Sequence, residues 1–126
     1  MTRPFVEHVG MEIAEFRAGY SRCTLQVAPV HFNTSGIVHG GALFTLADTG
    51  MGAAVWAALP KDQNCATVEI KINYFRPVLE GEVECISNVT HQGRTLANVD
   101  SELRAGGQLV AKANGTFAIF ARKGAA

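Results

Sequence analysis

Residues 39–59 are the one long stretch of this chain with a helical pattern, and they are apolar on almost every side. The large apolar residues of the stretch fall on several faces of the predicted helix: Leu43, Leu46, Met51, Val55 and Leu59. A helix that is apolar all round is buried, so protein has to surround this one on most sides. The rest of the chain is therefore expected to form a cover around a central helix.

Most of the remaining residues alternate between apolar and polar types, as half-buried strands do. We expect a capping turn or helix over residues 1–10, a loop over 29–38, and strands over 11–17, 20–28, 65–75, 82–90, 95–104 and 108–121. Turns that contain glycine join neighbouring strands into antiparallel hairpins. An antiparallel sheet with a single apolar helix must wrap around that helix, which predicts one α+β domain over residues 1–126. One sheet cannot enclose the helix fully, so we expect a second subunit to cover its remaining side.

Two strands carry more detailed expectations. In residues 65–75, strict alternation places Val68 and Ile70 on one face and Thr67 on the other. The middle of residues 108–121 is made of small residues, which predicts that a helix packs closely against it.

The composition excludes several classes of protein. Of the 126 residues 48% are hydrophobic, enough for the core of one domain. Eleven basic and eleven acidic side chains cancel and no basic stripe is present, which argues against a nucleic acid partner. No apolar run is long enough to cross a bilayer, and the polar N-terminus does not resemble a signal peptide. Three cysteines without close spacing favour a reducing compartment, so we expect a cytoplasmic protein.

The stretch HGGALFTLAD, from His39 to Asp48, holds the strongest chemical signal. Asp48 is the only ionisable side chain of the apolar run after the glycines, and such a carboxylate is costly unless it is paired or used. The amides that follow a glycine pair at a helix start can donate to an oxygen that gains negative charge. We therefore expect the Gly40 amide to polarise a carbonyl group that approaches closely over Gly41, with Asp48 as base or nucleophile.

The distance between these two groups predicts an oligomer. Gly40 and Asp48 are eight residues apart, about 12 Å along a helix axis, which is too far for both to act on one atom. Two such helices passing antiparallel across a two-fold axis would bring Asp48 of one subunit to the helix N-terminus of its partner. We therefore expect a site at a dimer interface and an inactive monomer.

Three further residues are candidates for supporting roles. Asn33 could orient a water or the carbonyl, and Thr67 could hold the Asp48 carboxylate. Each also has a plain structural interpretation, with Asn33 as a turn residue, Thr67 as an ordinary strand residue and His39 as a helix cap. The glycines could likewise serve close packing, and Asp48 could bond a neighbouring strand. The combination of an activator and a carboxylate on one element favours the catalytic interpretation.

Other chemistries find no support in the sequence. The four histidines lack the spacing of metal ligands, and motifs for a serine nucleophile or a phosphate-binding loop are missing. We therefore expect no metal site. Arg76 and Arg94, next to turns, are exposed cations that could meet the phosphates of a ligand.

The pattern Asn33-x2-Gly36-x2-His39-Gly40-Gly41-x6-Asp48, followed by Asn73-Tyr74-Phe75-Arg76-Pro77, resembles the hotdog-fold acyl-CoA thioesterases. It is most similar to the phenylacetic acid degradation branch and to the related 4-hydroxybenzoyl-CoA thioesterases of the HGG type. The resemblance runs from about residue 8 to residue 121 and agrees with the predicted order of elements.

The resemblance implies a role for each residue of the pattern. Gly40 matches the glycine whose amide polarises the thioester carbonyl, and Asp48 matches an acid, nucleophile or general base, supplied by the opposite subunit. Asn33 matches an amide side chain near the thioester or the attacking water. Thr67 matches a hydroxyl residue that supports the acid, and His39 matches the motif histidine at the helix start.

The resemblance also implies a substrate and an assembly. The substrate is an acyl-CoA with an aromatic or a short to medium acyl group, cleaved without a cofactor. Homodimers pair into a homotetramer, and the pantetheine arm threads between subunits. The nucleotide end lies near basic residues at the surface, for which we select Arg94. We expect Ala47, Met51 and Trp56 to shape the acyl pocket.

Two alternatives stay open. One is a hotdog enoyl-CoA hydratase, which would pair a histidine with the aspartate. The other is a non-catalytic acyl-CoA binding protein, for which an altered acid or an output domain would be typical.

Overall fold

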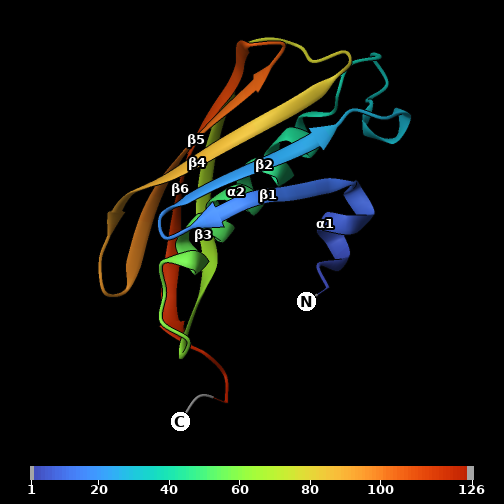
Figure 1. Ribbon diagram of the computed structural model, residues 1–126. Coiled ribbons are helices and arrows are strands. Elements are labelled where there is room, and N and C mark those ends of the chain that lie inside the picture. The colour runs from blue at the N-terminus through green and yellow to red at the C-terminus, as the bar shows by residue number, and fades with distance from the viewer. Residues whose placement is uncertain (1, 125–126) are drawn as a thin grey trace.

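The buried helix expected from the sequence is α2 (Gly40–Ala57), and six strands lie around it (Figure 1). The computed structural model describes residues 2–124. The other elements, in chain order, are α1 (Pro4–Val9), β1 (Met11–Arg17), β2 (Tyr20–Gln26), the 3-10 turn η1 (Pro29–His31), β3 (Gln63–Tyr74), β4 (Glu82–Gln92), β5 (Leu96–Ala105) and β6 (Gln108–Ala121). Every predicted strand is present, with its boundaries within two residues of the expected range.

The strands form one antiparallel sheet in the order β1-β2-β4-β5-β6-β3. The sheet curls around α2, and every strand contacts the helix (Figure 1). β1 and β3 are the two edges of the sheet, and both flank the side of α2 that the sheet leaves open. The predicted α+β architecture, an antiparallel sheet wrapped around one long helix, is confirmed.

α2 approaches the sheet closely because two glycines remove side chains at the contacts. At Gly50 a Cβ atom would lie 2.8 Å from Ser87 Oγ and 3.3 Å from Ser21 Oγ. Ser21 Oγ instead donates a hydrogen bond of 2.6 Å to the Gly50 carbonyl. At Gly115 in β6 a Cβ atom would lie 2.7 Å from Met51 Sδ on the helix. The expected close packing of a helix on the small residues of the last strand is confirmed.

β3 departs from strict alternation, which corrects one prediction. Its pairing with β6 shifts register between Thr67 and Glu69, so that Val68 forms a bulge. Thr67 pairs with the buried Phe117 and faces the helix, as Ile70 does, whereas Val68 is 61% exposed. The expected faces are wrong for Thr67 and Val68, because an extra residue in a bulge turns the side chains on its two sides relative to each other.

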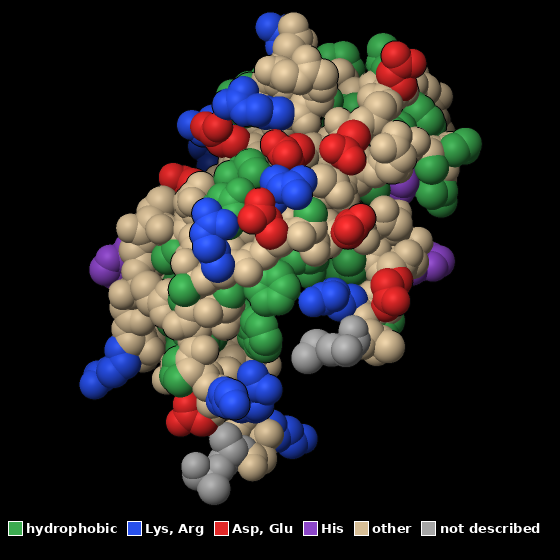
Figure 2. Space-filling model, in the orientation of Figure 1, with side chains coloured by type: hydrophobic (Ala, Val, Ile, Leu, Met, Phe, Trp, Pro, Cys, Tyr) green, Lys and Arg blue, Asp and Glu red, His purple; other side chains and the backbone are tan. Residues whose placement is uncertain are grey.

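Charges of both signs are mixed on the face of the molecule shown in Figure 2. Over β1, β2 and β4, acidic and basic side chains lie next to one another, and Arg22 pairs with both Glu15 and Glu84. This mixture agrees with the absence of a basic stripe in the sequence. Within residues 2–124, no helix combines the length and the hydropathy that a bilayer crossing requires.

The glycine contacts of α2 lead to a matched pair of stability predictions. Gly50→Ala should destabilise the protein, because overpacking against Ser87 and Ser21 costs about 1–3 kcal/mol, more than the gain of about 1 kcal/mol in helix propensity. Gly52→Ala should stabilise it, because a Cβ atom there would lie 3.7 Å from the Phe117 ring, an ordinary contact. Urea unfolding at one protein concentration measures both changes. Equal unfolding free energies for the two variants would contradict the close seating of the helix.

Candidate active site

The first turn of α2 presents one backbone amide without an internal partner. His39 is the N-cap, and its Nδ1 accepts a hydrogen bond of 2.7 Å from the Gly41 N–H. The Tyr74 hydroxyl donates to the Gly40 carbonyl at 2.7 Å. Among the hydrogen bonds found within residues 2–124, none is donated by the Gly40 N–H. That amide, at the positive end of the helix, is the group that an incoming carbonyl oxygen can use.

Neighbouring side chains leave no room for a Cβ atom at Gly41 and little room for one at Gly40. A Cβ atom at Gly41 would lie 2.8 Å from His39 Nδ1, and one at Gly40 would lie 3.3 Å from the Tyr74 ring and hydroxyl. Burial raises the pKa of Tyr74, so its hydroxyl stays protonated and able to donate. The two interpretations of the glycine pair, close packing and access to the backbone, are therefore compatible, and His39 acts as a cap.

Asn33 shapes the loop before α2. Its Oδ1 accepts hydrogen bonds from the N–H groups of Ser35 at 2.9 Å and of Ile37 at 3.2 Å. The turn interpretation of Asn33 therefore holds for the oxygen, and the Nδ2 group is the end that can meet a ligand. Asn33 and Gly40 line one cavity of about 300 Å³, which we call the Gly40 cavity.

His31 anchors this loop, a role that the sequence does not reveal. The side chain is only 5% exposed, its Nδ1 accepts the Ala28 N–H at 2.9 Å and its Nε2 donates to the Val9 carbonyl at 2.6 Å. Because Ala28 is a donor and Val9 an acceptor, the ring is neutral with its proton on Nε2. The carbonyl of His31 accepts the His39 N–H at 2.7 Å. His31 thus ties the end of α1 to the residue that caps α2.

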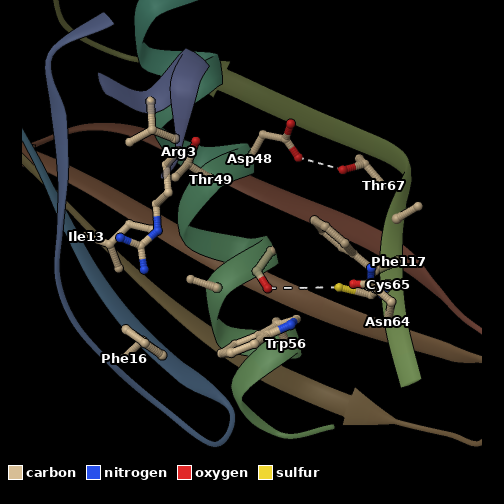
Figure 3. A pocket seen from close by; sticks show the side chains of 14 residues that line it. Arg3, Ile13, Phe16, Asp48, Thr49, Trp56, Asn64, Cys65, Thr67 and Phe117 are labelled. Carbon is tan, nitrogen blue, oxygen red and sulfur yellow. Dashed lines mark hydrogen bonds between the residues drawn. The ribbon is translucent and has the colours of Figure 1, made fainter. Parts of the chain in front are cut away.

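Asp48 lies half-buried on the open side of α2 and is held by a strand residue. Thr67 Oγ1 donates to Asp48 Oδ1 at 2.7 Å (Figure 3). Thr67 reaches the carboxylate because the bulge at Val68 leaves it on the helix side of β3. The expected contact between Thr67 and Asp48 is therefore present, although strict alternation places Thr67 on the wrong face.

Asp48 and Thr67 line a second, larger cavity of about 540 Å³, which we call the Asp48 cavity. α2 forms its floor, and β1 and β3 flank it, as Figure 3 shows. Most of its wall is apolar and includes the aromatic rings of Phe16, Trp56 and Phe117. Gly40 and Gly41 are not among the residues that line it, so a single chain does not bring the Gly40 amide and the Asp48 carboxylate together.

Two of the three residues expected to shape an acyl pocket lie elsewhere. Ala47 and Met51 are fully buried against the sheet and line neither cavity, so this expectation is wrong for them. Trp56 does line the Asp48 cavity. Ala47 and Met51 lie on the face of α2 that the sheet covers, whereas Trp56 lies on the open face. The sequence could not distinguish these faces, because the helix is apolar on all sides.

The cations are distributed differently from the prediction. Arg94 is exposed in the turn between β4 and β5 and lines neither cavity, so its role stays a prediction. Arg76 lines the Gly40 cavity. Arg3, which no pattern in the sequence marks, lines the Asp48 cavity.

The three cysteines are free and poorly suited to act as nucleophiles. Burial raises the pKa of Cys23 to about 11 and that of Cys85 to about 12. Cys65 lines the Asp48 cavity, and burial, followed by the negative charge of Asp48, raises its pKa. Within residues 2–124, no group of three or more histidine, cysteine or acidic side chains is placed to hold a metal ion.

A family comparison matches the part of the chain that contains most of the candidate catalytic residues. The model of the thioesterase superfamily matches residues 35–112. This range contains Gly40, Asp48 and Thr67, and it leaves out Asn33, α1 and β1.

Individual relatives extend the similarity to most of the chain. A candidate esterase of Saccharolobus solfataricus is 33% identical over 113 residues, which are 89% of this chain and 75% of the relative. The solved structure of conserved protein PA5202 from Pseudomonas aeruginosa is 41% identical, with a TM-score of 0.91 over 95% of this chain and 96% of that chain. Phenylacetic acid degradation protein PaaI from Thermus thermophilus, solved as a mutant, is 28% identical, with a TM-score of 0.86 over 92% and 98%.

The shared cavity of Asp48 and Cys65 predicts how the thiol titrates. Replacing the carboxylate in Asp48→Asn removes a charge that opposes the thiolate, so the pKa of Cys65 should fall. The pH dependence of alkylation by iodoacetamide, followed at each cysteine by mass spectrometry, measures this shift. Cys23 and Cys85 should stay unreactive in the folded protein, and Glu80→Gln should leave the profile unchanged. If the pH midpoint of Cys65 alkylation is the same in Asp48→Asn as in the wild type, the charge of Asp48 does not affect the Cys65 thiol.

Proposed function

The chain belongs to the thioesterase superfamily, has the hotdog fold and is a thioester hydrolase, and on that premise we propose that it cleaves an acyl-CoA to the free acid and CoA. The observation that carries the proposal is the Asp48 carboxylate, held by Thr67 at 2.7 Å, on a helix whose first amide has no partner within residues 2–124. A carboxylate and an oxyanion donor are the two groups that hydrolysis of a thioester calls for.

The Gly40 amide acts on the thioester oxygen. Attack on the carbonyl carbon moves negative charge onto that oxygen, and an N–H at a helix N-terminus stabilises the charge as it develops. His39 fixes the turn through the Gly41 N–H at 2.7 Å, which leaves the preceding amide for the substrate. The Nδ2 group of Asn33, in the same cavity, can donate to this oxygen or orient the water.

Asp48 acts by one of two routes. As a base, it takes a proton from a water that attacks the carbonyl carbon, and the carbon–sulfur bond then breaks to release CoA thiolate, which is protonated. As a nucleophile, its oxygen forms an anhydride with the acyl group as CoA leaves, and water then hydrolyses the anhydride. Thr67 occupies Oδ1 in either route and orients the carboxylate. A single turnover in heavy-oxygen water labels Asp48 only by the second route.

The complete site forms between two subunits. Gly40 and Asp48 line separate cavities of one chain, which supports a partner that supplies the other half. β3 is an edge strand with Val68 61% exposed, and Tyr74 at its end is 47% exposed. An unpaired edge with exposed apolar side chains is suited to pairing with a second copy. The homodimer pairs again into a homotetramer.

The substrate has an aromatic or a short to medium acyl group. The aromatic wall of the Asp48 cavity supports this choice, as does the similarity to a phenylacetic acid degradation protein. The pantetheine arm lies between the subunits, and Arg94 meets the nucleotide end. The reaction needs no cofactor, and the free thiols are consistent with a cytoplasmic protein.

No observation favours the alternative functions. A hydratase would pair a histidine with Asp48. No histidine lines the Asp48 cavity of one chain, and His39, at the helix start that the shared site contains, uses its Nδ1 to cap α2. A non-catalytic binding protein would not need the carboxylate that Thr67 orients.

Asp48→Asn tests the acid directly. Loss of a general base or nucleophile should lower kcat by about 10²–10⁴-fold with little change in KM, because the amide can still accept the Thr67 hydrogen bond. Thiol release from a panel of acyl-CoAs measures this, with Asp62→Asn, outside both cavities, as the control. An active Asp48→Asn enzyme would remove the residue from the chemistry. Absence of thiol release from any substrate with the wild-type protein would contradict the hydrolase proposal.

Mixed dimers test the shared site. Gly40→Pro removes the amide proton at a helix position that tolerates proline, and Gly40→Ala adds a Cβ atom but keeps the proton. Gly40→Pro and Asp48→Asn should each be inactive alone. Co-refolded, they should regain about a quarter of wild-type activity, because half of the dimers are mixed and each of these has one intact site. No recovery, with mixed dimers present by mass, would place both groups of each site in one chain.

A further inference from the structure

Arg3 places a cation in the wall of the largely apolar Asp48 cavity. Among the residues that line the Asp48 cavity, only Arg3 and Asp48 are charged. Asp48 turns towards β3, where Thr67 holds it, whereas Arg3 enters beside Ile13 of β1 on the opposite wall (Figure 3). The cavity therefore offers a carboxylate on one side and a guanidinium on the other.

The guanidinium of Arg3 has no acidic partner within residues 2–124. Glu7 lies one helical turn away, but its carboxylate accepts the backbone N–H of Arg3 at 2.7 Å. None of the ion pairs found in the described residues involves Arg3. Arg17, Arg22 and Arg104, by contrast, each pair with a glutamate. Arg3 is therefore available to an anion that enters the cavity.

Arg3 is exposed, and in Figure 3 its side chain runs beside Ile13 of β1 on the side of the cavity opposite to Thr67. The guanidinium therefore lines the Asp48 cavity while it keeps contact with solvent.

A neutral acyl group gains nothing from this cation, because the exposed guanidinium stays in water beside it. A carboxylate can accept two parallel N–H···O bonds from the guanidinium, a geometry that arginine matches. Resting on the proposed function, we propose that the Asp48 cavity takes the acyl group of the substrate. Arg3, in the side wall of the cavity, binds a carboxylate at the end of the acyl group that is remote from the thioester. The substrate is then the CoA thioester of a dicarboxylic acid.

The length of the cavity suits an acyl group with a short to medium chain or a single ring. Asp48 and Trp56 both line the floor, eight residues or about 12 Å apart along the helix axis. Phe16 and Trp56, with ring centroids 6.1 Å apart, lie at the end away from Asp48 (Figure 3). Arg3 lines the side of the cavity, between Asp48 at one end and the two aromatic rings at the other.

The test compares matched thioesters that differ in the terminal carboxylate. The pairs are adipoyl-CoA with hexanoyl-CoA and 4-carboxyphenylacetyl-CoA with 4-methylphenylacetyl-CoA. The wild-type kcat/KM should favour each carboxylate by about two- to fivefold, the effect of one exposed ion pair. Arg3→Gln should abolish the preference while neutral substrates are cleaved as before, and Arg3→Lys should retain part of it. Arg104→Gln, at an exposed paired arginine, should leave it unchanged.

Binding measured without turnover separates this proposal from the proposed function. The thioethers S-(5-carboxypentyl)-CoA and S-hexyl-CoA are compared by calorimetry, again with wild type and Arg3→Gln. A carboxylate preference in binding, with no hydrolysis of any thioester, would contradict the hydrolase and support the role of Arg3. Equal binding and cleavage of acidic and neutral compounds by the wild type would overturn the role of Arg3 and leave the hydrolase intact.

Pantetheine thioesters identify the source of the anion. They lack the phosphates of the nucleotide and keep the acyl group. If Arg3→Gln weakens all CoA thioesters alike and no pantetheine thioester, Arg3 binds a phosphate of CoA, and the proposal is wrong. If the carboxylate preference and its loss persist with pantetheine thioesters, the anion belongs to the acyl group.

Discussion

The fold depends on the close seating of α2 against a curved antiparallel sheet. The helix can lie that near only because Gly50 and Gly115 carry no side chain at the points of contact, where a Cβ atom would come within 2.8 Å and 2.7 Å of its neighbours. Ser21 uses the space at Gly50 for a hydrogen bond to the helix backbone. The contact buries most of an apolar helix and determines which face of α2 the sheet leaves open.

The chemistry is located on the side of α2 that the sheet leaves open. A carboxylate on the covered side would be buried in a close-packed core, out of reach of a substrate. Asp48 instead lies between the two sheet edges and accepts a hydrogen bond from a hydroxyl of β3. At the start of the helix, the Gly40 N–H has no hydrogen-bond acceptor within residues 2–124, and His39 accepts the hydrogen bond of the next amide, that of Gly41. One element therefore supplies both an amide donor and an acid, but at a separation that one chain does not bridge. This separation is the physical reason for proposing a site between subunits.

Particular residues show where sequence patterns are sufficient and where they fail. The pairing of Thr67 with Asp48 is expected from residue types, yet alternation puts Thr67 on the wrong face because the bulge at Val68 leaves no mark in the pattern. Met51 is expected in an acyl pocket and is instead packed on Gly115. Arg3 carries no motif at all and becomes notable only when α1 folds back beside β1.

The sequence by itself determined the buried helix, the hairpins around it and the identity of the chemical groups. These follow from local periodicity, from glycine in turns, and from the cost of a carboxylate in an apolar run, all of which act within a few residues. The tertiary structure alone decided which groups share a cavity. Contacts between distant segments depend on a strand bulge, on sheet curvature and on the helix face that the sheet covers. For this reason Thr67 meets Asp48, Arg3 joins the same cavity, and Gly40 lies in another one.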